Sequence, residues 1–137
     1  MVLERLNSKE NIETHELQCY LRFYNCVSQK YKDIILPALK KHIEKTVEKD
    51  SSKWGGYVTK PLTFVQSELS PFYSFLGELV QLELDTIIDG QRDDGAWFPA
   101  WEWGVYPEVW EKVKYEIAGK ITVDNLVKLD VFGRIEN

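Results

Sequence analysis

Residues 84–110 constrain the fold more than any other stretch, because they contain four of the chain's five tryptophans: Trp97, Trp101, Trp103 and Trp110. Tryptophan side chains carry a large apolar area, and so dense a cluster is stable only when other elements pack over it. The stretch begins with an apolar run of helical periodicity, so we expect a helix that leads into an aromatic loop. The sequence therefore predicts a helical fold organised around this tryptophan loop.

Composition limits the class of protein. The chain has 137 residues, 44% of them hydrophobic, which is enough for a single domain spanning residues 1–137 with a real core. Its 17 basic and 22 acidic residues give a net charge of −5 without a basic cluster, so we expect no nucleic-acid partner. The apolar runs are too short to span a bilayer, and the first residues do not resemble a signal peptide. We expect a cytoplasmic protein, and the sequence leaves open whether Met1 is its natural start.

Apolar residues spaced three and four apart predict about five helices. These are expected at 12–28, 31–49, 72–91, from Pro107 to Gly119, and from Thr122 to Gly133. The periodicity stops between residues 50 and 70, where we expect a long ordered loop that could include a short strand pair. The predicted fold class is all-α, with the long loop after the second helix and the tryptophan loop after the third.

Single residues mark the helix ends. Ser70 followed by Pro71 is typical of an N-cap and a first helical residue. Gly119 and Gly133 are expected to end the last two helices, Gly133 in the left-handed conformation. Pro37 lies either near the first turn of its helix or at a kink, because an interior proline removes a backbone donor.

Helices 12–28 and 72–91 have apolar residues on most sides, so we expect both to pack between neighbours, with 72–91 the most buried. Cys19 and Cys26 lie on the first of them. Seven residues of helix separate their Cα atoms by roughly 10 Å, beyond the reach of a disulfide. We expect two reduced, mostly buried thiols.

The pattern Gln91-x-x-x-Gly95-x-Trp97 at the end of an apolar helix resembles the glutamine–tryptophan repeat of squalene-hopene cyclases, relatives of terpenoid cyclases and protein prenyltransferases. From about His15 onward, further segments resemble the C-terminal half of longer, uncharacterised bacterial proteins described as squalene-cyclase-like or prenyltransferase-like. These segments are 54–61, 70–73, 101–104, 106–110, 125–126 and 132–134. The resemblance implies a partial α/α toroid, as a truncated or split version of those proteins.

The same resemblance implies that Gln91, Gly95 and Trp97 form a structural clasp. A glutamine at a helix end can bond exposed backbone groups, a glycine permits a tight turn, and the tryptophan covers both. The sequence departs from the longer form of the repeat upstream, where Thr86 replaces an aromatic residue.

Catalytic motifs of the resembling enzymes are absent from the sequence, which has neither Asp-x-Asp-Asp nor Asp-Asp-x-x-Asp. We interpret Asp93 and Asp94 as solvated turn residues, because aspartate bonds locally in turns. Glu102, between Trp101 and Trp103, is the one weak candidate for a catalytic acid, since an aromatic setting would favour its protonated form.

His15 and Cys19 lie four residues apart, and an antiparallel helix pair could bring His42 near them as a third zinc ligand. An incomplete ligand set is usually accidental, so the preferred interpretation is a packing histidine and a buried thiol. We expect no metal and no cofactor.

Trp101, Trp103 and Tyr106 are the candidates for lining a ligand pocket. Aromatic clusters more often serve packing, which is the preferred interpretation here as well. If a ligand binds, a neutral hydrophobic molecule or a sugar fits better than a diphosphate, because Arg92 is the only cation nearby in sequence.

Three functions follow as hypotheses. The first is a non-catalytic binding or scaffold domain, and the second is an enzyme domain that acts on a terpenoid or carbohydrate through the aromatic loop. The third is a protein-interaction module that completes its ring with another chain. A homodimer or an N-terminal partner chain is expected, because five helices make only part of a ring.

Overall fold

The computed structural model describes residues 2–8 and 10–136; Met1 lies outside them. This part of the chain forms five α-helices and two short 3-10 helices and contains no strand, which confirms the all-α class. Backbone contacts divide the chain into two compact units, Met1–Val65 and Gln66–Asn137. Each unit has buried apolar side chains of its own.

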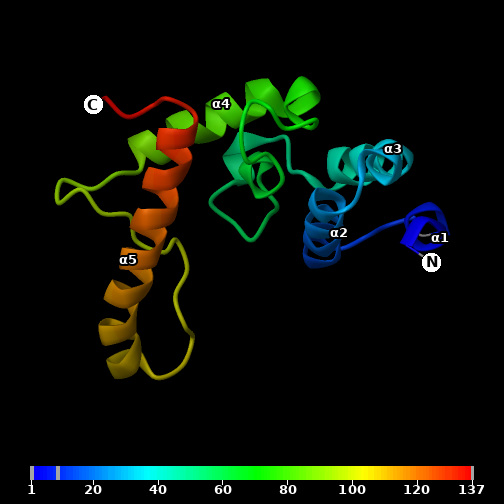
Figure 1. Ribbon diagram of the computed structural model, residues 1–137. Coiled ribbons are helices and arrows are strands. Elements are labelled where there is room, and N and C mark those ends of the chain that lie inside the picture. Colours follow the sequence, from blue (N-terminus) through cyan, green and yellow to red (C-terminus); the bar gives the residue numbers. More distant parts are fainter. Residues whose placement is uncertain (1, 9, 137) are drawn as a thin grey trace. The chain divides into compact units, whose positions relative to one another are not determined.

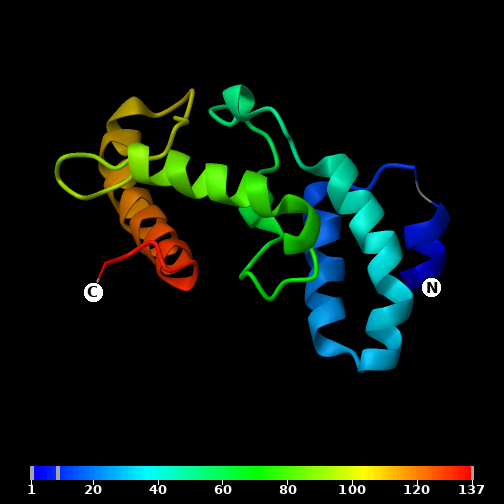
Figure 2. The ribbon, with the colours of Figure 1, turned by 90° about the horizontal axis from the view of Figure 1, so that it is seen from above.

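The first unit is built on α2 (Thr14–Cys26) and α3 (Gln29–Thr46), which lie side by side in both views (Figures 1 and 2). Each helix turns one apolar face inward, as the 3.6-residue period predicts. The buried side chains of the pair are Leu17, Leu21, Tyr24, Ile35, Leu39, His42 and Ile43. Pro37 lies inside α3 and not in its first turn.

The short helix α1 (Val2–Ser8) was not predicted, and it packs against α3. Seven residues with little periodicity are below the length at which an isolated helix is stable, so no local signal marks it. Its buried Leu6 and a hydrogen bond of 2.7 Å between the Leu6 carbonyl and His42 Nε2 attach it to α3. This helix therefore depends on tertiary contacts.

The loop after α3 is long and ordered, as predicted, and its core is Trp54. That side chain is buried and donates from Nε1 to the Glu48 carbonyl at 2.9 Å. The expectation of a short strand pair is wrong, because this segment forms the 3-10 helices η1 (Ser51–Lys53) and η2 (Pro61–Thr63). Pro61 has no backbone N–H to donate to a neighbouring strand, whereas the first turn of η2 does not require that donor.

The second unit contains α4 (Tyr73–Asp89) and α5 (Pro107–Val131), which contact each other. Helix α4 begins at Tyr73 with Phe72 as its N-cap, so the prediction of Ser70 as N-cap and Pro71 as first helical residue is wrong. The Ser70 hydroxyl accepts from the Phe72 N–H at 3.3 Å, in the turn before the helix. Its buried face contains Leu76, Val80, Glu83 and Leu84. Leu82 and Ile88 are exposed, so the expectation of burial on nearly all sides is wrong for α4.

The predicted break at Gly119 is also wrong, because α5 runs without interruption from Pro107 to Val131. Thr122 does not cap a new helix. Its hydroxyl donates to the Ala118 carbonyl four residues earlier, at 2.7 Å. A glycine inside a helix costs only about 1 kcal/mol, which the flanking turns offset. Gly133 does follow the helix end in the left-handed conformation, with φ of 64°, as predicted.

Candidate functional site

The tryptophan loop, residues 90–106, connects the end of α4 to the start of α5 (Figure 2). Trp97 lies within it and is 5% exposed, which confirms its predicted burial. Its indole Nε1 donates to the Ile87 carbonyl at 2.6 Å, and its backbone N–H donates to Thr122 Oγ1 at 3.1 Å. The Ile87 carbonyl, near the end of α4, also accepts from the Gly90 N–H at 3.2 Å, so Trp97 supplies a second donor there. Trp97 therefore contacts α4 through its side chain and α5 through its backbone.

Gln91 and Gly95 close the turn that precedes Trp97. Gly95 has φ of 81°, a conformation that glycine adopts without strain. Gln91 Nε2 donates to the Gly95 carbonyl at 3.0 Å. The prediction that the Gln91 side chain bonds backbone groups at the helix end is therefore wrong, because it closes the turn instead. Asp93 and Asp94 are exposed turn residues, and Asp94 Oδ1 accepts from the Ala96 N–H at 3.1 Å.

The other three tryptophans of the loop region form a stack centred on Trp110, in the first turn of α5. Trp110 is buried, and its ring centroid lies 5.3 Å from that of Trp101 and 5.5 Å from that of Trp103. The interplanar angles are 40° and 42°. Trp101 and Trp103 remain 53% and 41% exposed. Both therefore pack on one buried ring and present the rest of their surface to solvent.

A hollow of about 380 Å³ opens beside this stack. It is lined by Phe98, Pro99, Ala100, Trp101, Glu102, Trp110 and Lys114. Of the predicted ligand-lining residues, Trp101 is part of the lining, whereas Trp103 and Tyr106 are not. Tyr106 instead precedes α5 in the left-handed conformation, with φ of 55°. Phe98 and Lys114 were missed, because the position of α5 relative to the loop is a tertiary feature.

The polar groups of the hollow are Glu102 and Lys114. Glu102 is exposed, so the desolvation that a catalytic acid requires is missing. Lys114 Nζ donates to Glu111 Oε2 at 2.6 Å, and this bond raises the pKa of Lys114. The hollow thus offers one carboxylate and one ammonium group whose charge is largely balanced by Glu111.

A second surface feature is the outward face of α5. Val123, Val127 and Val131 are exposed and lie four residues apart, so they share one side of the helix. Leu126, beside them, is exposed as well. The buried residues Ala118, Asn125 and Leu129 lie on the opposite side. Helix α5 therefore carries an apolar strip, defined here as Val123, Leu126, Val127 and Val131, that no described residue covers.

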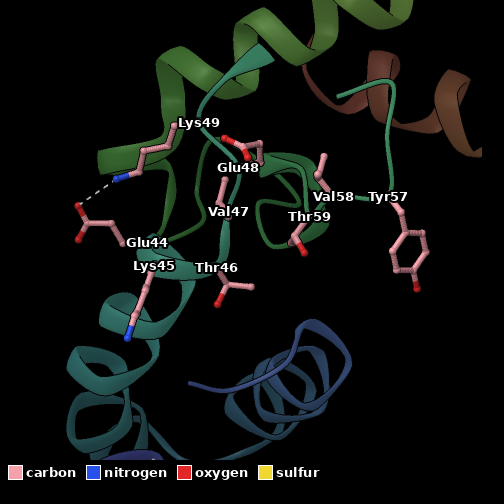
Figure 3. Close-up of a pocket in the computed structure, with 9 residues that line it drawn as sticks. All are labelled: Glu44, Lys45, Thr46, Val47, Glu48, Lys49, Tyr57, Val58 and Thr59. Carbon is pink, nitrogen blue, oxygen red and sulfur yellow. Dashed lines mark ion pairs between the residues drawn. The ribbon is translucent and has the colours of Figure 1, made fainter. Parts of the chain in front are cut away.

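The first unit has a larger hollow, of about 570 Å³, at the end of α3 (Figure 3). It is lined by residues 44–49 and 57–59. Tyr57 is fully exposed, and Glu44 pairs with Lys49 at 3.7 Å on the surface. Figure 3 shows the Glu44–Lys49 pair on one side of the hollow and the Tyr57 side chain pointing away from it. The charged pair neutralises itself in solvent, so these groups do not form a site.

The proposed zinc ligands do not come together. His15 and Cys19 are exposed, whereas His42 is buried and bonded to the Leu6 carbonyl. Within residues 2–8 and 10–136, no three side chains of the metal-binding types converge. Cys26 is exposed too, so the expectation of two buried thiols and a packing His15 is wrong. The neighbours of α2 cover only one of its sides.

No protein-family model, curated protein or solved structure matches the chain. Within the described part of the chain, every helix is too short or too polar to cross a bilayer.

Proposed function

We propose that the chain is a non-catalytic scaffold domain that assembles with a second copy of itself through the apolar strip of α5. The observation that carries this proposal is the double-sided apolarity of α5, which buries Ala118 and Leu129 on one side and exposes Val127 on the other. A helix with apolar residues on opposite sides is stable in water when neighbours cover both of them.

Charge favours a second copy as the partner. Lys120, Asp124 and Lys128 follow one another at intervals of four residues beside the apolar strip, so the charge alternates along one edge. When two such helices pair antiparallel about a two-fold axis between Leu126 and Val127, each edge faces the same edge of its copy. Asp124 then lies opposite Lys128 of the second copy, and Val123 lies near Val131. The strip and its charged edge are thus self-complementary, as an isologous interface requires.

The resemblance to squalene-cyclase-like proteins supports the same proposal. In an α/α toroid each helix packs between neighbours, and a chain with part of the ring leaves an apolar edge for another chain to cover. Gln91, Gly95 and Trp97 would then be structural residues of the repeat.

Light scattering after gel filtration tests the proposal. The wild-type chain is expected to have twice its 16.1 kDa mass at micromolar concentration. Val127→Glu should give a monomer, because it places a charge in the apolar strip. Val105→Glu is the matched control, since Val105 is 61% exposed against 57% for Val127 but lies in the loop.

Charge reversal tests the antiparallel arrangement. Asp124→Lys should weaken the dimer by placing like charges across the interface, and adding Lys128→Asp should restore it. A monomeric wild-type chain would refute the proposal, and so would a dimer that survives Val127→Glu.

A further inference from the structure

We propose that the hollow beside Trp110 is a saccharide-binding site, in which one face of a neutral sugar ring stacks on Trp101. The inference goes beyond the scaffold function and is independent of it, because the hollow lies at the N-terminal end of α5 and the apolar strip lies in its C-terminal half. Its volume, about 380 Å³, falls in the range of small-molecule sites.

Trp101 provides the stacking platform. Its ring packs on Trp110 at 5.3 Å and is nevertheless 53% exposed, so it is held in place and still offers surface to a ligand. Phe98 and Pro99 add apolar walls. Phe98 is itself fixed by Tyr115, edge to face at 5.4 Å, and by the Arg92 guanidinium 4.4 Å from its ring centroid. Such a preformed aromatic surface binds a flat apolar face with little loss of conformational entropy.

The two polar residues of the hollow indicate the chemical class of its ligand. Glu102 only accepts hydrogen bonds, whereas Lys114 only donates, and one of its three donors is used by Glu111. A hydroxyl group donates and accepts, so a polyhydroxylated ring can satisfy both residues at once. A terpene would cover Glu102 and Lys114 without bonding them, which is unfavourable for polar groups that lose water.

Charge argues against the ionic alternatives. A diphosphate would face the carboxylate of Glu102, and Lys114, the one cation in the lining, is already paired with Glu111. A quaternary ammonium ion would meet the Lys114 ammonium group in the lining. A neutral ligand with hydroxyl groups is the class that conflicts with neither charge.

The test is a titration of the full chain with cellohexaose, maltohexaose and N-acetylchitohexaose, monitored by the indole N–H signals in the NMR spectrum and by tryptophan fluorescence. At least one of the three should give a saturable shift at up to millimolar concentration. Farnesol, farnesyl diphosphate and choline are titrated in parallel. Absence of saturation with all three saccharides overturns the proposal, and so does saturation by farnesol, farnesyl diphosphate or choline alone.

Trp103 supplies a matched control for Trp101, because both rings stack on Trp110 with nearly the same geometry and only Trp101 lines the hollow. Trp101→Ala should weaken saccharide binding at least about 10-fold, the loss of one stacked ring, and Trp103→Ala should change it less than about 3-fold. Equal losses in the two variants would overturn the placement of the site.

Glu102→Gln is a second binding variant, which tests the site even if Trp101→Ala perturbs the fold. It removes the charge of an exposed side chain, keeps its shape, and should weaken binding by about 3- to 10-fold through the loss of a charge-assisted hydrogen bond. Unchanged affinity would overturn the assigned role of Glu102. Val127→Glu should bind the saccharide with wild-type affinity, because Val127 does not line the hollow. The scaffold proposal and the saccharide proposal can therefore fail independently.

Discussion

The indole N–H of Trp97 and the carbonyl of Ile87 form a hydrogen bond of 2.6 Å that joins the tryptophan loop to the last turn of α4. Trp97 is buried, and its backbone N–H also donates to Thr122 Oγ1 on α5 at 3.1 Å. Trp97 thus connects three segments of the second unit, α4 through its side chain and α5 through its backbone N–H.

Trp97→Ala is therefore expected to lower the free energy of unfolding by about 3–5 kcal/mol, as a large-to-small change in a core does. Trp97→Phe keeps most of the apolar area and removes the indole donor, while the Ile87 carbonyl still accepts from the Gly90 N–H at 3.2 Å. It should therefore cost only about 0.5–1.5 kcal/mol, the net contribution of one hydrogen bond. Urea denaturation followed by circular dichroism measures both. A loss below about 1 kcal/mol for Trp97→Ala would refute the clasp role.

Gly95→Ala should destabilise the second unit by about 1–2 kcal/mol, because φ of 81° brings an added Cβ close to the following carbonyl. Gly104→Ala is the control in the same loop, where no atom lies within 4 Å of the added Cβ and φ is not in the left-handed range. Gly104→Ala should leave stability nearly unchanged. Similar urea midpoints for the two variants would contradict the strained turn.

His42→Leu should release α1 from the first unit, since the Leu6 carbonyl would lose its buried partner at a cost of about 1–3 kcal/mol. Hydrogen exchange should accelerate over Val2–Ser8 more than over α2. His15→Leu is the control, because His15 is exposed. If exchange over α1 is the same in both variants, His42 does not hold that helix.

Asp50 is expected to make the 3-10 helix η1 sensitive to acid. Hydrogen bonds from the Ser52 hydroxyl, at 2.7 Å, and from the Ser52 N–H, at 3.1 Å, hold the pKa of Asp50 below its ordinary value of 3.8. A lowered pKa means that this stabilisation is complete above the unfolded value and is lost as pH falls through the folded value. NMR titration should show Ser52→Ala raising the pKa of Asp50, because it removes the hydroxyl donor and keeps the N–H. An unchanged pKa would exclude the Ser52 hydroxyl as a cause.

The sequence by itself determined the elements that local patterns specify. Apolar spacing located α2, α3, α4 and both ends of α5, because one covered face is enough to select a helix over other conformations. Pro107 and Gly133 marked the ends of α5 through their own backbone preferences. The burial of Trp97 was predictable too, since its area and its place after an apolar helix leave few alternatives.

The tertiary structure alone decided which of several apolar faces is covered. Cys19, Cys26 and Leu82 lie on helices with more apolar surface than their neighbours bury, and no local signal ranks those faces. Gly119 stays helical because contacts on both sides of it outweigh a local preference of about 1 kcal/mol. Trp101 and Trp103 are equivalent in sequence pattern, and only the position of α5 places one of them in the hollow. Periodicity fixes which residues share a side of a helix, whereas packing fixes what that side meets.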